Sequence, residues 1–257
     1  MHVAMTGAAH GIGAASAARL KGQGAFITAF DIEEPAAHVD RWIQVDMSEP
    51  DAISAAAAKA DGPFDVLVNC AGLPPRPGLE AKVLAVNTFG LIAMTKAMLP
   101  KLKDGASIVS LASKAGSRWR ENIEQVKALL ALPGNDALPD FIAKQGIDPV
   151  RSYDLSKEAV IVWSISQVEP LIARDIRINT VSPAAVETRI LDDFVIAFGD
   201  RATKMMARTR RSGRPEEVAE VVAFLASPQS SWIKGVDMPV DGGTTALLAA
   251  DAIGLAH

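Results

Sequence analysis

The only tyrosine in this chain, Tyr153, stands four residues before a lysine, Lys157, in the stretch YDLSK. A spacing of four places two side chains on the same face of a helix, one turn apart. A phenol has a reference pKa near 10, and a neighbouring ammonium favours its ionised form. The pair therefore predicts either a proton donor tuned toward neutral pH or an ordinary surface contact, and the spacing alone leaves both open.

A glycine-rich turn, TGAAHGIG at 6–13, lies between an apolar run and an alanine-rich segment near the start of the chain. Gly7, Gly11 and Gly13 permit tight backbone angles and let the chain approach a pyrophosphate. The free N–H groups and the dipole of the following helix attract that anion. The turn predicts a dinucleotide site, and a plain glycine turn is the alternative.

Asp31 ends the second apolar run, where a carboxylate can accept hydrogen bonds from the ribose hydroxyls of adenosine. The same carboxylate would repel a 2′-phosphate. No Lys or Arg follows it at 32–34, and His10 is the only basic residue in the glycine-rich turn. These residues predict NAD over NADP. Asp46 either contacts the adenine amino group or caps a turn.

Continuous apolar runs alternate with helical patterns along the whole chain, which indicates a parallel sheet covered on both faces. The expected strands are 2–7, 25–31, 41–47, 64–72, 106–113, 175–183 and 236–243. The main expected helices are 11–24, 51–62, 78–102, 153–173 and 215–227. We expect an α/β, doubly wound Rossmann fold with a seven-stranded parallel sheet, built as one domain over 1–257.

The composition narrows the class of protein. Of 257 residues, 49% are hydrophobic and 22% charged, with a formal net charge of −4, which argues against nucleic acid as a partner. Cys70, the single cysteine, cannot form an intrachain disulfide, and we expect it to be a buried small residue. The four histidines form no ligand pair at helical spacing, so no metal site is expected. No leader pattern and no run of membrane-spanning length are evident, which predicts a cytoplasmic protein without a membrane partner.

A set of motifs in a fixed order resembles the classical short-chain dehydrogenase/reductase family, and the resemblance spans nearly the whole chain. The motifs are TGAAHGIG at 6–13, NCAG at 69–72, Asn87, Ser113, Tyr153 with Lys157 at the opening of a helix, Asn179, SPAAVET at 182–188, GRPEEVAEVVAFLAS at 213–227 and VDGG at 240–243. The chain departs from the family pattern at two positions. Cys70 stands where a second asparagine or another small residue is common, and Ala184 stands where a glycine is usual.

The resemblance implies a catalytic set of four residues for hydride transfer between NAD(H) and a CH–OH group. Tyr153 is the proton donor and acceptor, and Lys157 lowers the pKa of Tyr153 and hydrogen-bonds the nicotinamide ribose. Ser113 holds the substrate oxygen, and Asn87 supports a water that links Lys157 to solvent. Proton and hydride then move in step at the same carbon–oxygen bond. The structural alternatives are a turn or cap serine for Ser113 and a packed polar side chain for Asn87.

The resemblance also implies which residues contact the cofactor. They are Gly7, His10, Gly11, Ile12, Gly13, Asp31, Asp46, Met47, Asn69, Ala71, Gly72, Tyr153, Lys157, Pro183, Val186 and Thr188. Thr188 is placed to meet the carboxamide or a phosphate.

Two segments point to the substrate. The stretch between Ser113 and Tyr153 is longer than the family usually has, and the surplus at about 117–148 carries two helical patterns. An ordered apolar insertion of this kind predicts a cover over a hydrophobic substrate, with a subunit contact or a plain surface excursion as alternatives. It resembles the insertion of bacterial 3α-hydroxysteroid dehydrogenase/carbonyl reductases. A second segment at about 189–211 is expected to be an apolar substrate loop.

The leading hypothesis is therefore an NAD-dependent dehydrogenase of an apolar secondary alcohol, with a 3α-hydroxysteroid favoured. The alternatives are a dehydrogenase of aromatic or alicyclic alcohols or diols and a non-catalytic NAD-binding regulator. An insertion directly before Tyr153 could block one of the usual subunit contacts. We therefore expect a homodimer built through residues 214–240, with a tetramer as the alternative.

Overall fold

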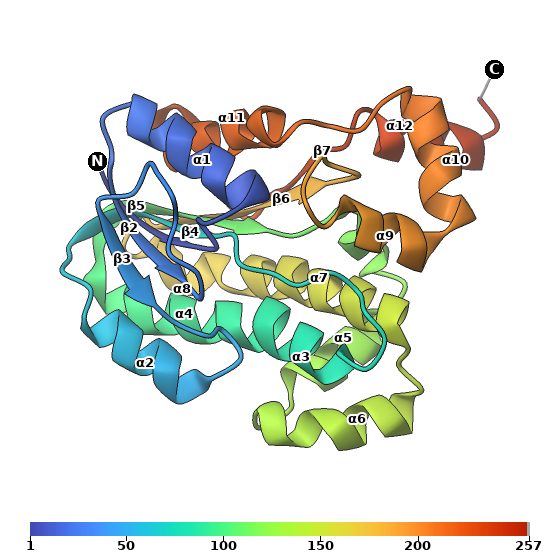
Figure 1. The fold of residues 1–257 in the computed structure, drawn as a ribbon, viewed down its shortest axis with the longest axis horizontal. Helices are drawn as coiled ribbons and strands as arrows, with labels where there is room; N and C mark the ends of the chain where they lie inside the picture. Colours follow the sequence, from blue (N-terminus) through green and yellow to red (C-terminus); the bar gives the residue numbers. More distant parts are fainter. Residues whose placement is uncertain (256–257) are drawn as a thin grey trace.

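The computed structural model describes residues 1–255. Its centre is one parallel sheet with the strand order β3-β2-β1-β4-β5-β6-β7 (Figure 1). The strands are β1 His2–Thr6, β2 Phe26–Asp31, β3 Arg41–Gln44, β4 Phe64–Asn69, β5 Leu102–Leu111, β6 Arg177–Pro183 and β7 Asp237–Val240. The predicted doubly wound, seven-stranded sheet is confirmed.

Helices cover both faces of the sheet. In Figure 1, α1 (Gly11–Gly22) and α11 (Pro215–Ala226) lie on the upper face. The lower face carries α2 (Pro50–Ala58), α4 (Leu91–Met98), α7 (Pro149–Ser166) and α8 (Val168–Ile172). One buried apolar cluster joins the strands to α2, α4 and α7, and a second joins them to α1 and α11. Burial on both faces explains why the strands read as continuous apolar runs.

The helix expected at 78–102 is interrupted by a π-helical stretch around Asn87. It consists of α3 (Glu80–Leu84), a π-helical stretch (Ala85–Gly90), α4 and a 3-10 turn (Leu99–Lys101). A π-bulge inside an α-helix often marks a functional position, and Asn87 lies in this one. By length and composition alone the helix Glu80–Lys101 could cross a membrane, but 61% of its most apolar window is buried inside the protein. That burial is typical of a core helix.

Helix α7 begins four residues earlier than the sequence analysis predicted. Asp148 is its N-cap, with a side chain that accepts a hydrogen bond from the Arg151 N–H, and Pro149 occupies the first helical position. Both are strong helix-start signals. Tyr153 and Lys157 consequently lie inside a regular, well-anchored helix, not in its first turn.

The remaining elements lie around one end of the sheet. The insertion forms α5 (Ile123–Leu130) and α6 (Leu138–Gln145), as its helical patterns predicted, with a short 3-10 turn (Asn135–Ala137) between them. A further 3-10 helix (Lys114–Arg118) directly follows Ser113. The segment expected as a substrate loop is helical, with α9 (Leu191–Phe198) and α10 (Asp200–Thr209). After a 3-10 turn (Pro228–Ser230) and β7, the chain ends in α12 (Thr244–Ala252).

Candidate active site

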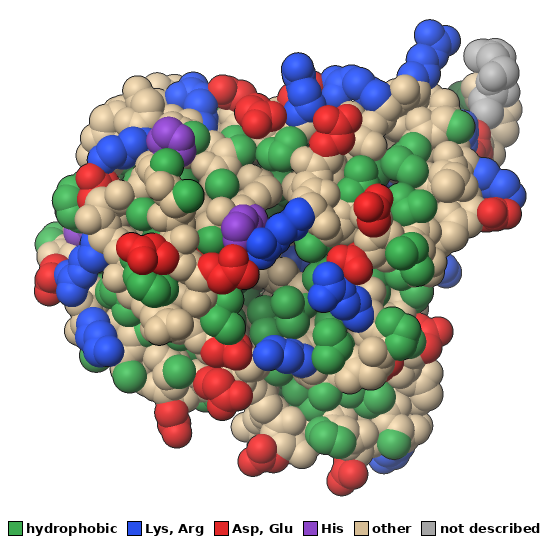
Figure 2. All heavy atoms as spheres, viewed as in Figure 1, with side chains coloured by type: hydrophobic (Ala, Val, Ile, Leu, Met, Phe, Trp, Pro, Cys, Tyr) green, Lys and Arg blue, Asp and Glu red, His purple; other side chains and the backbone are tan. Residues whose placement is uncertain are grey.

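A cavity of about 830 Å³ opens at the carboxyl ends of the strands. It lies over β1 and β4, where the winding of the chain reverses, which is the place where open α/β sheets bind ligands. Figure 2 shows this face, with a hollow near its middle that has hydrophobic side chains inside and charged side chains of both signs on its rim. The cavity extends from the glycine-rich turn to α9, α10 and α12.

The glycine-rich turn is packed so closely that larger residues would not fit. A Cβ added at Gly13 would lie 1.8 Å from the Gly7 carbonyl oxygen, and one at Gly7 would lie 2.4 Å from the Ala71 nitrogen. Gly7 and Gly11 also have positive φ angles of 70° and 55°. The turn therefore gives a bare backbone cradle at the start of α1. This arrangement fits the pyrophosphate of a dinucleotide.

Asp31 holds the turn in place from the end of β2. Its Oδ2 accepts a hydrogen bond of 2.9 Å from the Ala9 N–H, and its Oδ1 accepts one of 3.2 Å from the Glu33 N–H. Next to it, the Glu33 carboxylate contacts the His10 ring at 2.6 Å and Arg189 at 3.4 Å. Hydrogen bonds from His10 and Arg189 lower the pKa of Glu33. Arg189 comes from a loop that is distant in the sequence, so sequence position did not predict its contact with Glu33.

Asp46 has the turn-capping contacts that were one of its two expected roles. Its Oδ1 accepts hydrogen bonds from the Ser48 N–H at 2.8 Å and the Ser48 hydroxyl at 2.7 Å. Burial raises its pKa, but these hydrogen bonds and nearby Lys82, 3.5 Å away, outweigh it and hold the pKa below its usual value. Asp46 and Lys82 also line the cavity, so Asp46 caps the turn and is still part of the cavity wall.

Tyr153 projects from α7 into the cavity and is only 7% exposed. Burial raises the pKa of its phenol well above the ordinary value, and a hydrogen bond with the Ser113 side chain opposes the rise. Ser113 also caps the 3-10 helix after β5, accepting from the Ala115 N–H at 3.2 Å, and its hydroxyl faces the Pro183 carbonyl at 3.5 Å. The capping alternative for Ser113 is thus present together with its place beside Tyr153.

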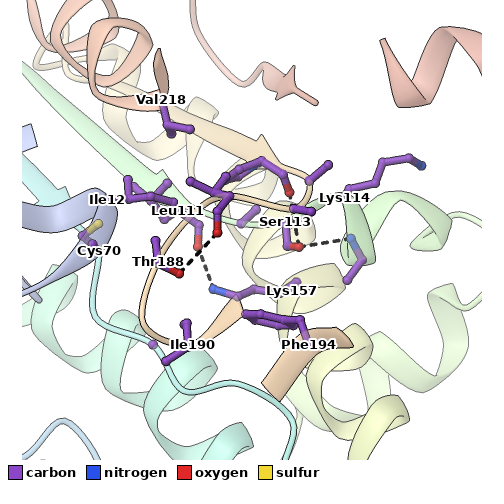
Figure 3. A pocket seen from close by; sticks show the side chains of 18 of the residues that line it. Ile12, Cys70, Leu111, Ser113, Lys114, Lys157, Thr188, Ile190, Phe194 and Val218 are labelled. Carbon is purple, nitrogen blue, oxygen red and sulfur yellow. Dashed lines mark hydrogen bonds between the residues drawn. The ribbon is translucent and has the colours of Figure 1, made fainter. Parts of the chain in front are cut away.

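Lys157 lies one turn further along α7 and is 6% exposed. Its ammonium donates a hydrogen bond of 2.9 Å to the Leu111 carbonyl oxygen, as Figure 3 shows. It lies 5.7 Å from the centre of the Tyr153 ring. Burial lowers the pKa of Lys157 to about 8. Burial of the phenol dominates and raises the pKa of Tyr153, so the lowering of that pKa by Lys157 stays a prediction.

Asn87 is fully buried and does not line the cavity, yet it is close to Lys157. Its Oδ1 accepts from the Leu73 N–H at 2.7 Å, and its Nδ2 donates to the Leu73 carbonyl and to the Ser156 hydroxyl, both at 3.1 Å. A Cβ added at Gly72 would lie 3.3 Å from the Asn87 Oδ1 and 3.5 Å from the Lys157 ammonium nitrogen. Asn87 therefore fixes the loop after β4 against α7.

Fifteen of the sixteen residues expected to contact the cofactor line the cavity, and Asn69 does not. The Asn69 side chain is buried, and its Nδ2 donates to the hydroxyls of Thr95 at 2.9 Å and Ser110 at 3.2 Å. It holds β4 to β5 and α4, and the expected cofactor contact of Asn69 stays a prediction. Cys70, expected to be buried, is partly exposed at the cavity wall, where desolvation raises its pKa to about 12. A thiol with that pKa is not a nucleophile at neutral pH.

The loop after β6 closes the cofactor side of the cavity. Pro183, Val186 and Thr188 line it, and the Thr188 methyl group would lie 3.0 Å from a Cβ added at Gly11. The Thr188 hydroxyl donates to the Val186 carbonyl at 3.4 Å, which is drawn in Figure 3. This contact places the loop directly over the first turn of α1.

Helices α9 and α10 form an apolar wall opposite that loop. The ring of Phe194 meets the Tyr153 ring edge-on at 5.0 Å between centroids, and the rings of Phe194 and Phe198 stack at 6.2 Å. Met205, Met206 and Leu248 extend the same wall. Leu248 belongs to α12, so this helix also lines the cavity.

Three ion pairs hold this wall to the rest of the protein. Arg76 contacts Asp193 of α9 at 2.7 Å, Arg208 of α10 contacts Asp251 of α12, and Arg201 of α10 lies 3.6 Å from Asp154 of α7. The substrate segment is thus anchored to three separate elements.

The insertion does not cover the substrate, because no residue of 117–148 lines the cavity. Instead α5 and α6 pack beneath α3 and α7, as Figure 1 shows, through a separate buried cluster that includes Leu129, Phe141 and Leu155. A buried ion pair, Arg151–Glu158 at 2.6 Å, is joined to the insertion by Asn122, which donates to Glu158 at 2.6 Å. The cover predicted from the apolar pattern is therefore wrong, since that pattern serves the packing on α7.

Sequence reasoning missed several charged residues of the cavity, among them Lys82, Lys114, Arg189, Arg201, Arg211 and Glu217. Arg211 and Glu217 form a close ion pair at 2.7 Å. They come from loops and helices that meet only in the folded chain. Only Lys114, next to Ser113 in the sequence, could have been found from its position.

Comparison with known proteins shows the family of this chain. Residues 1–124 match the family model described as short chain dehydrogenase, and residues 140–245 match the one described as enoyl-(acyl carrier protein) reductase. A coniferyl-alcohol dehydrogenase of Pseudomonas sp. strain HR199 is 34% identical over 94% of this chain and 95% of its own length. A 3-alpha-hydroxysteroid dehydrogenase/carbonyl reductase of Comamonas testosteroni is 30% identical over 96% and 97%.

A solved structure shares the fold in detail. The 3-alpha-hydroxysteroid dehydrogenase from Pseudomonas sp. B-0831, complexed with NADH, superposes with a TM-score of 0.82 and is 31% identical over 97% of this chain and 99% of that one. These matches identify an oxidoreductase that acts on CH–OH groups with a nicotinamide cofactor, and the chain belongs to the classical short-chain dehydrogenase/reductase family.

Proposed function

We propose that this protein oxidises an apolar, ring-bearing alcohol with NAD, and reduces the matching carbonyl compound in reverse. The observation that carries the proposal is the position of Tyr153. Its hydroxyl is within reach of the Ser113 side chain, and its ring packs against Phe194 of α9. A substrate oxygen bound by these two hydroxyls would leave the carbon skeleton beside apolar side chains.

The residues of this chain handle the proton in that reaction. The Tyr153 hydroxyl exchanges a proton with the substrate oxygen, and the Ser113 hydroxyl holds that oxygen in place. The Lys157 ammonium adds a positive charge within the same buried space, and its pKa of about 8 leaves it mostly charged at neutral pH. Bound NAD supplies the hydride acceptor. We assign Asn87 a positioning role, with the water link from Lys157 to solvent as part of the proposal.

Two acids support NAD as the preferred cofactor. Asp31 and Glu33 stand at the end of β2, next to the glycine-rich turn that fits the pyrophosphate. Carboxylates there bind ribose hydroxyls and repel a 2′-phosphate. Arg189 and His10 are held by Glu33. The solved relative with NADH agrees with this preference.

A 3α-hydroxysteroid is our first candidate for the substrate. A flat, rigid ring system would lie along the stacked rings of Phe194 and Phe198, and two matched proteins are named as 3-alpha-hydroxysteroid dehydrogenases. An aromatic alcohol of the coniferyl type is the second candidate. The same aromatic wall and the coniferyl-alcohol dehydrogenase among the relatives favour it.

NADH formation by the purified protein tests these assignments. Androsterone, its 3β epimer and coniferyl alcohol are each supplied with NAD, and again with NADP. Turnover of androsterone alone supports the steroid, and turnover of coniferyl alcohol alone moves the assignment to aromatic alcohols. NADP serving as well as NAD would contradict the role given to Asp31 and Glu33.

Replacing Tyr153 with Phe separates an enzyme from a non-catalytic NAD-binding regulator. The variant should lose nearly all turnover while its fluorescence titration with NADH stays unchanged, because the phenyl ring keeps the packing against Phe194. A wild-type protein that binds NADH but oxidises no alcohol would support the regulator.

We further propose a homodimer built through α11 and β7. The insertion covers the α3 and α7 surface, so an interface there would have to be formed by α5 and α6 instead. β7 is an edge strand, and near it Trp232 is 95% exposed and Phe224 40% exposed. Exposed aromatic side chains beside a sheet edge are typical of an interaction surface.

A further inference from the structure

We propose that the substrate carries an anionic group, a carboxylate, and that Lys114 binds it. The inference deepens the proposed function and rests on it. It names a specificity determinant in the wall of the cavity that contains Tyr153.

Lys114 is the first charged residue that a substrate meets beyond the catalytic serine. It follows Ser113 directly, is half-buried and lines the cavity. In Figure 3 its side chain extends away from Ser113 and Lys157, while Phe194 lies on the other side of the site. Lys114 therefore adds a positive charge to the cavity wall directly after Ser113 without contacting Ser113 or Lys157.

The ammonium of Lys114 lacks a close acidic partner among the described residues. Its hydrogen bond of 2.7 Å goes to the neutral Ser117 hydroxyl, and no ion pair within 4.0 Å in residues 1–255 includes it. A half-buried charge without a partner is costly, and a bound anion would remove that cost.

The acids that face Lys114 are already engaged. Asp241 lines the cavity, but its oxygens accept hydrogen bonds from the Gly243 N–H and from the Thr245 N–H and hydroxyl at the start of α12. Asp237 accepts from the hydroxyls of Thr180 and Ser182, both at 2.7 Å. Both carboxylates act on Lys114 from a distance, and burial still lowers its pKa.

A second cation, Arg201, lines the same cavity but already has a partner. Its guanidinium lies over the Phe198 ring at 5.3 Å and forms an ion pair with Asp154 at 3.6 Å. Lys114, which has no such pair among residues 1–255, is therefore the cation that a bound anion would meet.

A carboxylate fits this receptor better than a phenolate. A phenol with a pKa near 10 is neutral at physiological pH, whereas a carboxylic acid is ionised. The neutral walls formed by Phe194, Phe198 and Met206 would contact the carbon skeleton of the substrate.

The test compares matched substrates that differ only in charge. 4-Hydroxycyclohexanecarboxylate and its neutral carboxamide are oxidised with NAD by the wild-type protein, Lys114→Met and Lys114→Arg. We expect the wild type to favour the carboxylate about 10-fold to 100-fold in kcat/KM, the usual range for a hydrogen bond to a charged group. Lys114→Met should bring the two substrates level, and Lys114→Arg should keep most of the preference.

The control is Lys204→Met, which removes the same charge from an exposed site on α10 outside the cavity. It should keep the wild-type preference, so a loss in Lys204→Met as well as Lys114→Met would indicate only the general field of the protein and overturn the proposal. Equal use of both substrates by the wild type, or a preference for the carboxamide, would overturn it too.

A binding measurement keeps this result separate from the proposed function. The NADH-loaded protein is titrated calorimetrically with cyclohexanecarboxylate and with cyclohexanecarboxamide. Tighter binding of the carboxylate that is lost in Lys114→Met supports the anion site even if no alcohol is oxidised, in which case only the dehydrogenase assignment fails. If androsterone or coniferyl alcohol is oxidised but cyclohexanecarboxylate binds no more tightly than the carboxamide, the dehydrogenase assignment is supported and the anion site is refuted.

Discussion

Replacing Lys157 with Met should stabilise the fold and abolish catalysis. The ammonium is 6% exposed, and burial lowers its pKa from the ordinary 10.5 to about 8. A difference of that size corresponds to roughly 3 kcal/mol of unfavourable free energy in the folded state at pH 7. The hydrogen bond to the Leu111 carbonyl is lost in the variant, and an unpaired carbonyl costs about 1–3 kcal/mol. The net change at pH 7 is therefore smaller than the charge effect alone.

The dependence on pH isolates the charge effect. Below pH 8 the lysine is protonated in both the folded and the unfolded chain, so the wild type bears the whole cost. Between about 8 and 10.5 the unfolded chain binds more protons than the folded one, so the stability of the wild type rises with pH. Over that window the wild type should gain about 3 kcal/mol relative to Lys157→Met.

Urea unfolding at a fixed protein concentration, at pH 7 and at pH 10, measures this difference for both proteins. Other groups that titrate in the window, such as Cys70, contribute to both and cancel in the comparison. Lys96→Met, which removes an exposed lysine from α4, should follow the wild type. Parallel stability curves for the wild type and Lys157→Met would refute the reasoning, because they would show that the buried ammonium carries no cost.

Further predictions concern the insertion, the cofactor and the assembly. Arg151→Met should destabilise the protein by about 3–5 kcal/mol in urea unfolding, since it leaves the Glu158 carboxylate buried without its cation, and an unchanged midpoint would contradict this. Asp31→Asn should lower kcat/KM with NAD about 10-fold and narrow the preference for NAD over NADP, because it weakens charged hydrogen bonds to the ribose. An equal loss of kcat/KM with both cofactors would indicate only damage to the glycine-rich turn. Trp232→Glu should convert a dimer to a monomer in sedimentation, and a tetramer unaffected by this change would exclude α11 and β7 as the interface.

Much of the fold was predictable because its signals are local. The apolar strand runs, the alanine-rich α1 and the glycine-rich turn each follow from residues that are neighbours in the sequence, and the alternation of strand and helix fixes a parallel sheet. Helix α7 was placed four residues late because the cap at Asp148 and Pro149 was overlooked, although this signal too is local. The helices of the insertion were likewise predicted from their periodicity.

The amino-acid sequence by itself determined which residues have the chemistry for hydride and proton transfer, since Ser113, Tyr153 and Lys157 stand in elements whose order brings them to one edge of the sheet. Only the tertiary structure decided which surface the insertion packs against, because an apolar stripe predicts that one helix face is buried but does not identify its partner. The tertiary structure also decided which charged side chains meet at the site. Arg189 reaches Glu33 and Arg201 comes near Lys114 across long stretches of chain, and electrostatic effects depend on distance in space, which sequence position does not give.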